Sequence, residues 1–294
     1  MDLSVKRLGI VVGYRCNFHC SHCLVSEKGQ RELSGPEIDK LRGIVATQQF
    51  ESVLFIGGEP TLYIKTINRI LEGFQPRPDG IVAITTNGHF AKTEAGAVNT
   101  LKKIHGLNFV QVSYDNYHKR FIKLSNIANL YSASKKLGMR FAVLVAVLSP
   151  LDLVLLQELK AAGIAEKYVR VQGIHAIGSA AANQLEYSYP SFNPDVLKKK
   201  CPKNGTIVYI CGEGFTICCS HLAFERENTN FVHSTMEQHE ASGFFRLISR
   251  FSFEELMFKA GVGREELKPR HSYPCALCGL IFERMQKLHP ELLR

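Results

Sequence analysis

Residues 8–23 read LGIVVGYRCNFHCSHC and join an apolar run to three closely spaced cysteines. Residues 8–12 are continuously apolar and rich in β-branched side chains, which is typical of a parallel strand covered on both faces. Cys16, Cys20 and Cys23 follow on a loop with the spacing C-x3-C-x2-C. Three thiolates on one loop at a strand end predict a metal-binding group.

Two kinds of metal centre fit this group when it is considered alone. A four-iron cluster bound by three thiolates keeps one iron open to a small ligand. The alternative is a zinc ion completed by His19 or His22, because imidazole and thiolate together make good tetrahedral zinc ligands.

Five further apolar runs follow the first, with helical segments between them. Ser34 and Glu37 have the spacing of a capping box that opens a helix to about residue 49, while Gly138 and Gly163 stand where helices should end. The runs are residues 53–56, 81–85, 109–113, 141–148 and 168–171, and the other helices are expected at 62–73, 93–105 and 119–137. Six strand–helix alternations predict an α/β fold whose parallel, barrel-like sheet places its chemistry at the carboxyl ends of the strands.

The strand–helix alternation ends after Gly178. Residues 179–194 are polar and irregular, and a second group of cysteines and a helix-rich tail follow. We therefore expect residues 1–180 to form the barrel-like core and residues 181–294 a smaller C-terminal domain.

Polar residues stand at the ends of the second, third and fourth strands. A carboxylate suits an ammonium group, and glycines let a backbone approach a ligand closely. As alternatives, Asn87-Gly88 is also a plain turn signal, and Ser113 is a suitable helix cap. The strand ends carry Gly57, Gly58, Glu59 and Pro60, then Thr86 and Asn87, then Ser113 and Asp115.

These motifs together resemble the radical S-adenosylmethionine (SAM) superfamily over roughly residues 7 to 178. The resemblance implies a (β/α)6 partial TIM barrel in which Cys16, Cys20 and Cys23 hold a [4Fe-4S] cluster that binds SAM. It implies that residues 57–60 bind the SAM amino group, and that Thr86, Asn87, Ser113 and Asp115 bind its ribose and carboxylate. His22 would lie against the adenine, and Gln172 would touch the adenine or ribose.

A second group of cysteines fills the last third of the chain. Cys201, Cys219, Cys275 and Cys278 resemble the ligands of a SPASM or twitch extension, which implies an auxiliary [4Fe-4S] cluster. A zinc knuckle with four cysteine ligands is the alternative, and Cys218 can replace Cys219 as a ligand. The remaining thiols, Cys211 and Cys218, are then candidate hydrogen-atom donors, or buried small hydrophobes.

The architecture resembles radical SAM epimerases of aminoglycoside sugars and of ribosomal peptides. We expect an enzyme whose 5′-deoxyadenosyl radical abstracts hydrogen from an unactivated carbon, and inversion of a sugar-type natural product, with a cysteine as hydrogen donor. The cysteine loop begins so early that no leader-binding domain is expected before it, which favours a sugar over a peptide. The alternatives are a peptide epimerase, and a dehydrogenase or cross-linking enzyme.

Composition sets the remaining expectations. The 294 residues carry a formal charge of +9, but the longest basic run, at residues 198–200, lacks interleaved aromatics, which argues against a nucleic-acid partner. No apolar stretch approaches the roughly 20 residues needed to cross a bilayer, so we expect a cytoplasmic protein without a membrane partner. The resemblance implies a flavodoxin- or ferredoxin-type electron donor. From another class, a non-catalytic zinc- or nucleic-acid-binding protein is the alternative.

Overall fold

The computed structural model describes residues 5–25, 29–74, 79–224 and 230–293. The chain divides into two compact units, one spanning Lys6–Glu186 and the other running from Tyr187 onward. The sequence placed this boundary near residue 180.

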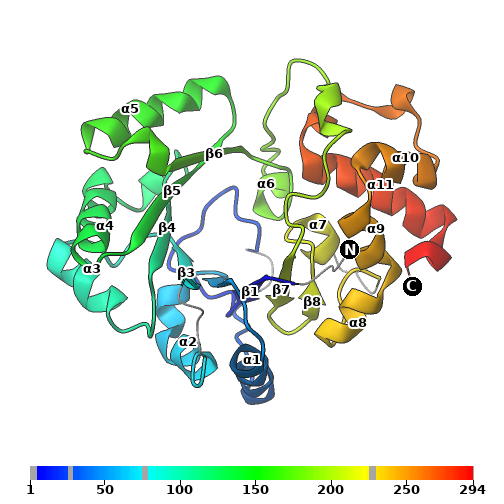
Figure 1. Ribbon diagram of the computed structural model, residues 1–294. Helices are drawn as coiled ribbons and strands as arrows, with labels where there is room; N and C mark the ends of the chain where they lie inside the picture. The colour runs from blue at the N-terminus through cyan, green and yellow to red at the C-terminus, as the bar shows by residue number, and fades with distance from the viewer. Residues whose placement is uncertain (1–4, 26–28, 75–78, 225–229, 294) are drawn as a thin grey trace. The chain divides into compact units, whose positions relative to one another are not determined.

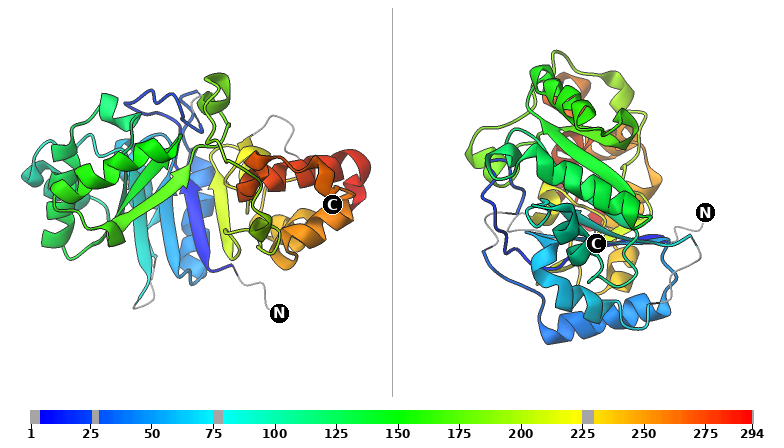
Figure 2. Two further views of the ribbon diagram at one scale, coloured as in Figure 1. Left: turned by 90° about the horizontal axis from the view of Figure 1, so that it is seen from above. Right: turned by 90° about the vertical axis from the view of Figure 1, so that its left-hand side faces the viewer.

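The first unit is a six-stranded parallel sheet with strand order β6-β5-β4-β3-β2-β1. Each strand pairs with its sequence neighbour, and helices lie along the outer side of the curved sheet (Figures 1 and 2). The α/β partial barrel predicted from the alternation is therefore confirmed. The strands are β1 (Arg7–Val11), β2 (Ser52–Ile56), β3 (Ile81–Thr86), β4 (Phe109–Ser113), β5 (Arg140–Val147) and β6 (Val169–Gly173).

Two helices of this unit show the start and stop signals that the sequence carries. Ser34 and Glu37 form the predicted capping box before α1, which buries Ile38, Leu41 and Val45 on one face because residues three and four apart share a side. Gly138 has φ +65° directly after α4, where a left-handed residue ends a helix. The helices are α1 (Gly35–Thr47), α2 (Ile64–Ile70), α3 (Glu94–Leu101), α4 (Leu124–Lys136), α5 (Val154–Ala161) and α6 (Ser179–Ala182).

Two local expectations were wrong. The helix predicted for residues 119–137 is broken, because a 3-10 turn, η3 (His118–Arg120), precedes α4, and another, η2 (Pro60–Tyr63), precedes α2. The strands are also not all covered on both faces. Alternate residues of β2 and β4 are partly exposed. Three of the five residues of β6 are exposed, because β6 is an edge strand that pairs with β5.

The second unit combines an antiparallel hairpin with helices. The strands β7 (Thr206–Ile210) and β8 (Gly214–Thr216) pair from Val208 opposite Thr216 to Ile210 opposite Gly214. The Phe244 ring lies 4.9 Å from the rings of Phe231 and Phe282, which form an aromatic core. The helices are α7 (His221–Phe224), α8 (Met236–Ala241), α9 (Gly243–Arg250), α10 (Phe253–Ala260) and α11 (Pro274–Leu288). Within the described residues, every helix is too short or too polar to span a membrane.

Candidate functional site

The first cysteine group lies on the loop after β1. Burial, the charge of Asp115 and the neighbouring Cys23 and Cys16 raise the pKa of Cys20 to about 12. Three thiols this close to one another repel as thiolates, so a bound cation would stabilise them together. The loop lines a cavity of about 440 Å³ together with Gly58, Ser179 and Asn183.

The loop is held at its start by the glycines that follow β2. Gly58 N donates to Gly13 O (2.8 Å) and Glu59 N donates to Arg15 O (3.0 Å). A Cβ on Gly57 would lie 2.3 Å from Gly13 O, and one on Gly58 would lie 2.2 Å from Arg15 O. These glycines are therefore required because the backbone of the cysteine loop lies against them. The sequence pattern predicts instead that a ligand approaches them.

The loop is held at its far end by α6. Ser179 N donates to Cys23 O (2.9 Å), and Asn183 Nδ2 donates to Ser21 O (3.1 Å). A Cβ on Gly178, at φ +54°, would lie 2.5 Å from Leu24 O. Both ends of the metal-binding loop are thus fixed by backbone contacts with the barrel.

Glu59 is buried at 1% exposure and joins the ends of β2 and β3. Its Oε1 accepts hydrogen bonds from the Thr61 amide (3.1 Å), the Thr61 hydroxyl (2.6 Å) and the Thr86 hydroxyl (2.7 Å). Its Oε2 accepts one, from the Asn87 amide (2.8 Å). A carboxylate oxygen accepts about two hydrogen bonds, so Oε2 can accept a further hydrogen bond, as from an ammonium group.

Asn87 connects the third strand end to the cysteine loop. Its Nδ2 donates to Asn17 Oδ1 (2.7 Å) and lies 3.7 Å from the sulfur of Cys16. Burial raises the pKa of Cys16 despite the N–H that Phe18 donates to its sulfur, and the charge of Glu59 raises it further. Residues predicted from two separate strand ends, Glu59 and Asn87, therefore lie beside the first cysteine.

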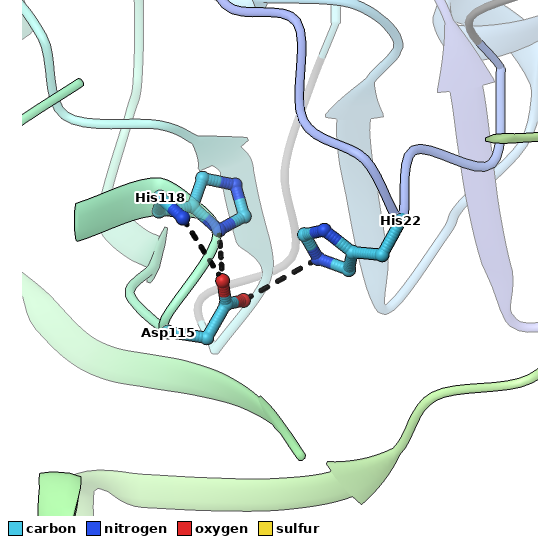
Figure 3. Close-up of side chains that lie close together, drawn as sticks. All are labelled: His22, Asp115 and His118. Atoms are coloured by element: carbon cyan, nitrogen blue, oxygen red, sulfur yellow. Dashed lines mark hydrogen bonds and ion pairs between the residues drawn. The ribbon is translucent and has the colours of Figure 1, made fainter. Parts of the chain in front are cut away.

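Asp115, at the end of β4, contacts two histidines (Figure 3). Its Oδ2 lies 3.4 Å from His22 Nε2, and its Oδ1 lies 2.9 Å from His118 Nδ1. Oδ1 also accepts the amides of Tyr117 and His118, both at 3.0 Å. Burial alone would raise the pKa of Asp115, but the contacts with His118 and His22 hold it well below its usual range. The carboxylate is ionised.

Sequence reasoning placed His22 and Asp115 in one site but did not pair Asp115 with His118. The signal was the spacing Asp-x-x-His directly after a strand, which lets a turn carry the histidine back to the carboxylate. The predicted residues Ser113 and Gln172 stand at the ends of β4 and β6, where Ser113 is half-buried and Gln172 is exposed. Pro60 is buried at the start of η2.

The second cysteine group contains five thiols of the second unit. Burial raises the pKa of Cys278 well above its ordinary value, and the charges of Cys218, Cys201, Cys275 and Cys219 raise it further. Burial likewise raises the pKa of Cys275 to about 12 and that of Cys218 beyond its usual range, with Cys219 as the first charged neighbour of each. Burial also raises the pKa of Cys201, which is distant in sequence, and the charge of Cys219 raises it further.

Cys211 stands apart from these five thiols. It follows β7 in the turn of the hairpin, whereas Cys218 follows β8 at the other end, because Val208 pairs with Thr216. The two cysteines are therefore about five strand positions apart along the hairpin, which is roughly 17 Å at about 3.4 Å a residue. Of the two predicted hydrogen donors, the structure places one within the cysteine group and the other at the hairpin turn.

Comparisons with known proteins agree with this description. The Radical SAM superfamily model matches residues 10–140. The protein named "Putative peptide biosynthesis protein YydG" of Bacillus subtilis is 23% identical, over 97% of this chain and 94% of that protein. GTP 3′,8-cyclase 2 of Mycobacterium tuberculosis is 32% identical, but over 46% of this chain and 40% of the cyclase. A solved structure of native anSMEcpe with bound AdoMet and Cp18Cys peptide aligns with 98% of this chain and 97% of its own, at 15% identity and a TM-score of 0.51, and shares the fold.

Proposed function

This chain is an enzyme with a radical SAM domain, and from that premise we propose that it inverts a carbon centre in a peptide. In this proposal the enzyme removes a hydrogen atom from the substrate carbon, and the thiol of Cys218 returns one. The thiyl radical left on Cys218 then takes one electron from the reductant and one proton from water, which restores the thiol. The observation that carries the proposal is that five thiols share one group in the second unit, one more than a four-iron cluster binds.

The cysteine loop fits the cofactors of the family. When bound, the [4Fe-4S] cluster and SAM together supply a 5′-deoxyadenosyl radical. In our proposal Cys16, Cys20 and Cys23 hold the cluster, and the free lone pair of Glu59 Oε2 accepts the ammonium group of SAM. Asn87, which already lies beside Cys16, orients the amino-acid part of SAM.

The second group fits an auxiliary [4Fe-4S] cluster. We assign Cys201, Cys219, Cys275 and Cys278 as its ligands, and Cys218 as the surplus thiol. A thiol suits the return of hydrogen because its S–H bond is weaker than an aliphatic C–H bond. Burial raises the pKa of Cys218, which favours the thiol form that a hydrogen-atom donor requires.

A peptide substrate now replaces the sugar that the sequence favoured. The Bacillus subtilis relative, which aligns along almost the whole chain, carries a peptide-biosynthesis name. The structure that shares this fold was solved with a peptide bound. Both observations support a peptide, and neither concerns a sugar.

The test uses anaerobically reconstituted enzyme, dithionite, SAM and deuterated water. A mixture of synthetic peptides and, separately, a mixture of aminoglycosides are screened for faster 5′-deoxyadenosine release and for deuterium in the product by mass spectrometry. We expect the peptide mixture to respond and the wild type to add one deuterium to each inverted product. Stimulation by aminoglycosides alone would overturn the peptide assignment.

Variants separate the donor from the ligands. Cys218→Ala should keep about eight irons per chain and SAM cleavage, but lose deuterium incorporation at least tenfold. Cys211→Ala is the control, and it should retain incorporation because its thiol is at the far end of the hairpin. If Cys218→Ala loses about four irons, Cys218 is a ligand and the donor assignment is wrong.

A further inference from the structure

The trio His22, Asp115 and His118 has the composition of a metal site without cysteine ligands. Two imidazole nitrogens and one carboxylate oxygen, one from each residue, all lie within 4.8 Å of one another. Bonds of about 2.0–2.2 Å from one ion to nitrogen and oxygen place neighbouring ligand atoms about 3–3.5 Å apart. His22 Nε2 lies 3.4 Å from Oδ2 of Asp115 and His118 Nδ1 lies 2.9 Å from Oδ1, so each imidazole faces its own carboxylate oxygen at about that spacing.

The trio brings together side chains from three elements of the first unit. His22 comes from the cysteine loop, Asp115 from the end of β4 and His118 from η3 (Figure 3). Their side chains are 13%, 1% and 12% exposed. The Asp115 carboxylate is fixed by the two backbone amides on Oδ1, and the ring of His22 packs 4.6 Å from that of Tyr117. Such outer contacts orient metal ligands in known sites.

The nitrogen of His118 that faces the carboxylate is close to it without good hydrogen-bond geometry. His118 Nδ1 is buried and lies 2.9 Å from Asp115 Oδ1, yet it lacks hydrogen-bond geometry toward any described partner. Two ligand atoms side by side on one ion adopt this arrangement, because both direct lone pairs at the metal. The Asp115 side chain is a carboxylate, the kind of ligand that supplies negative charge to a divalent cation.

We propose that His22, Asp115 and His118 bind one divalent transition-metal ion, of which zinc is the probe. Imidazole nitrogen suits zinc, copper, iron or nickel, whereas magnesium and calcium prefer oxygen ligands alone. Three protein ligands leave a fourth position for water or a substrate group. The site is separate from the iron–sulfur ligands and does not depend on the proposed function, so a protein that fails to cleave SAM can still bind zinc here.

The experiment compares zinc binding by the cluster-loaded wild type, His118→Ala and His105→Ala. His105 is an exposed histidine of the same unit and serves as the control. The zinc and iron contents are measured together after dialysis. X-ray absorption spectroscopy at the zinc edge then identifies the ligand atoms. We expect one zinc per chain with nitrogen or oxygen neighbours at about 2.0–2.1 Å, rather than sulfur at about 2.3 Å.

His118→Ala should bind zinc more than about tenfold more weakly while its iron content stays that of the wild type. His105→Ala should match the wild type in both metals. Thermal melting without zinc shows whether His118→Ala is folded, and His118→Gln repeats the test with a bulkier replacement. Zinc bound with unchanged affinity in both His118 variants, sulfur-ligated zinc, or absence of zinc from the wild type would each overturn the proposal.

Discussion

His239 is a neutral histidine buried in the second unit. Its Nε2 accepts a hydrogen bond from the Ile217 amide (2.8 Å), so the proton is on Nδ1, which lies 3.1 Å from Nδ1 of His233. Burial, with a smaller contribution from His233, lowers the pKa of His239 to about 3. The side chain therefore links β8 to α8 only while it is uncharged.

This histidine makes the second unit sensitive to acid. The unfolded chain binds a proton near pH 6.5, whereas folded His239 does not, so its contribution is complete above pH 6.5 and is lost as the pH falls toward 3. We expect the free energy of unfolding to fall by about 2 kcal/mol between pH 7 and pH 5. Hydrogen exchange of peptides from residues 214–241 measures the change locally.

His239→Gln should be less stable at pH 7 but should remove most of this pH dependence, because glutamine does not titrate. His105→Gln, at an exposed position, should leave the profile as it is in the wild type. Equal pH dependence in His239→Gln and the wild type would contradict the assignment.

For single residues, the sequence predicted which side chains belong to the site better than it predicted which side chains they contact. The cysteines, Glu59 and Asn87 could be identified because their types and spacings carry the signal. That Glu59 bonds to Thr61 and Thr86 could not be identified, because these contacts depend on side-chain directions at two different strand ends. The contact of His118 with Asp115 does have a signal, the Asp-x-x-His spacing after a strand.

At the scale of elements, the junction of β2 with the cysteine loop depends on two glycines. Beyond the strands, Gly58 N donates to Gly13 O and Glu59 N donates to Arg15 O, which continues the pairing of β1 and β2. Because the contact is backbone against backbone, neither side can move aside for a larger residue. The geometry of the first cysteine group depends on this junction.

Gly58→Ala should therefore destabilise the protein and lower iron binding at the first group. We expect a loss of about 2–4 kcal/mol, in the range of overpacked and strained sites, measured by denaturant unfolding. Gly43→Ala is the matched control. Gly43 is in α1 with open space around it, so alanine should stabilise the helix by up to about 1 kcal/mol. A Gly58→Ala protein as stable as the wild type would show that the loop is not fixed here.

The elements themselves were largely predictable, because apolar runs and capping signals are local properties. The exceptions have tertiary causes. β6 is exposed because of its position in the strand order, which no local pattern reports. The helix predicted from residue 119 begins at Leu124 because the preceding turn follows the Asp115 contacts, and the amides of Tyr117 and His118 bond to that carboxylate.

At the scale of the whole molecule, the two cysteine groups belong to different compact units. Each group is built from contacts within its own unit, so its metal content should respond independently. A Cys275→Ala, Cys278→Ala double variant should lose about four of about eight irons, and Cys16→Ala should lose the other four, as measured by iron analysis. Loss of all iron from either variant would show that the two sites are coupled.

The division into a barrel and a cysteine-rich C-terminal part was predictable from where the alternation ends. Which thiols assemble in the second part was predictable only in part. Cys201, Cys219 and Cys275 are separated by long stretches, and the inclusion of Cys218 but not Cys211 follows from the pairing register of β7 and β8.

The cysteine loop and its backbone anchor have a consequence for biosynthesis. The three thiols, Gly58 and Asn87 all occur within the first 87 residues, whereas Cys278 is added about 190 residues later. At ribosomal rates of about 5–20 residues per second, the two events are about 10 to 40 seconds apart. A nascent chain therefore contains a full set of ligands for the first centre well before those for the second exist.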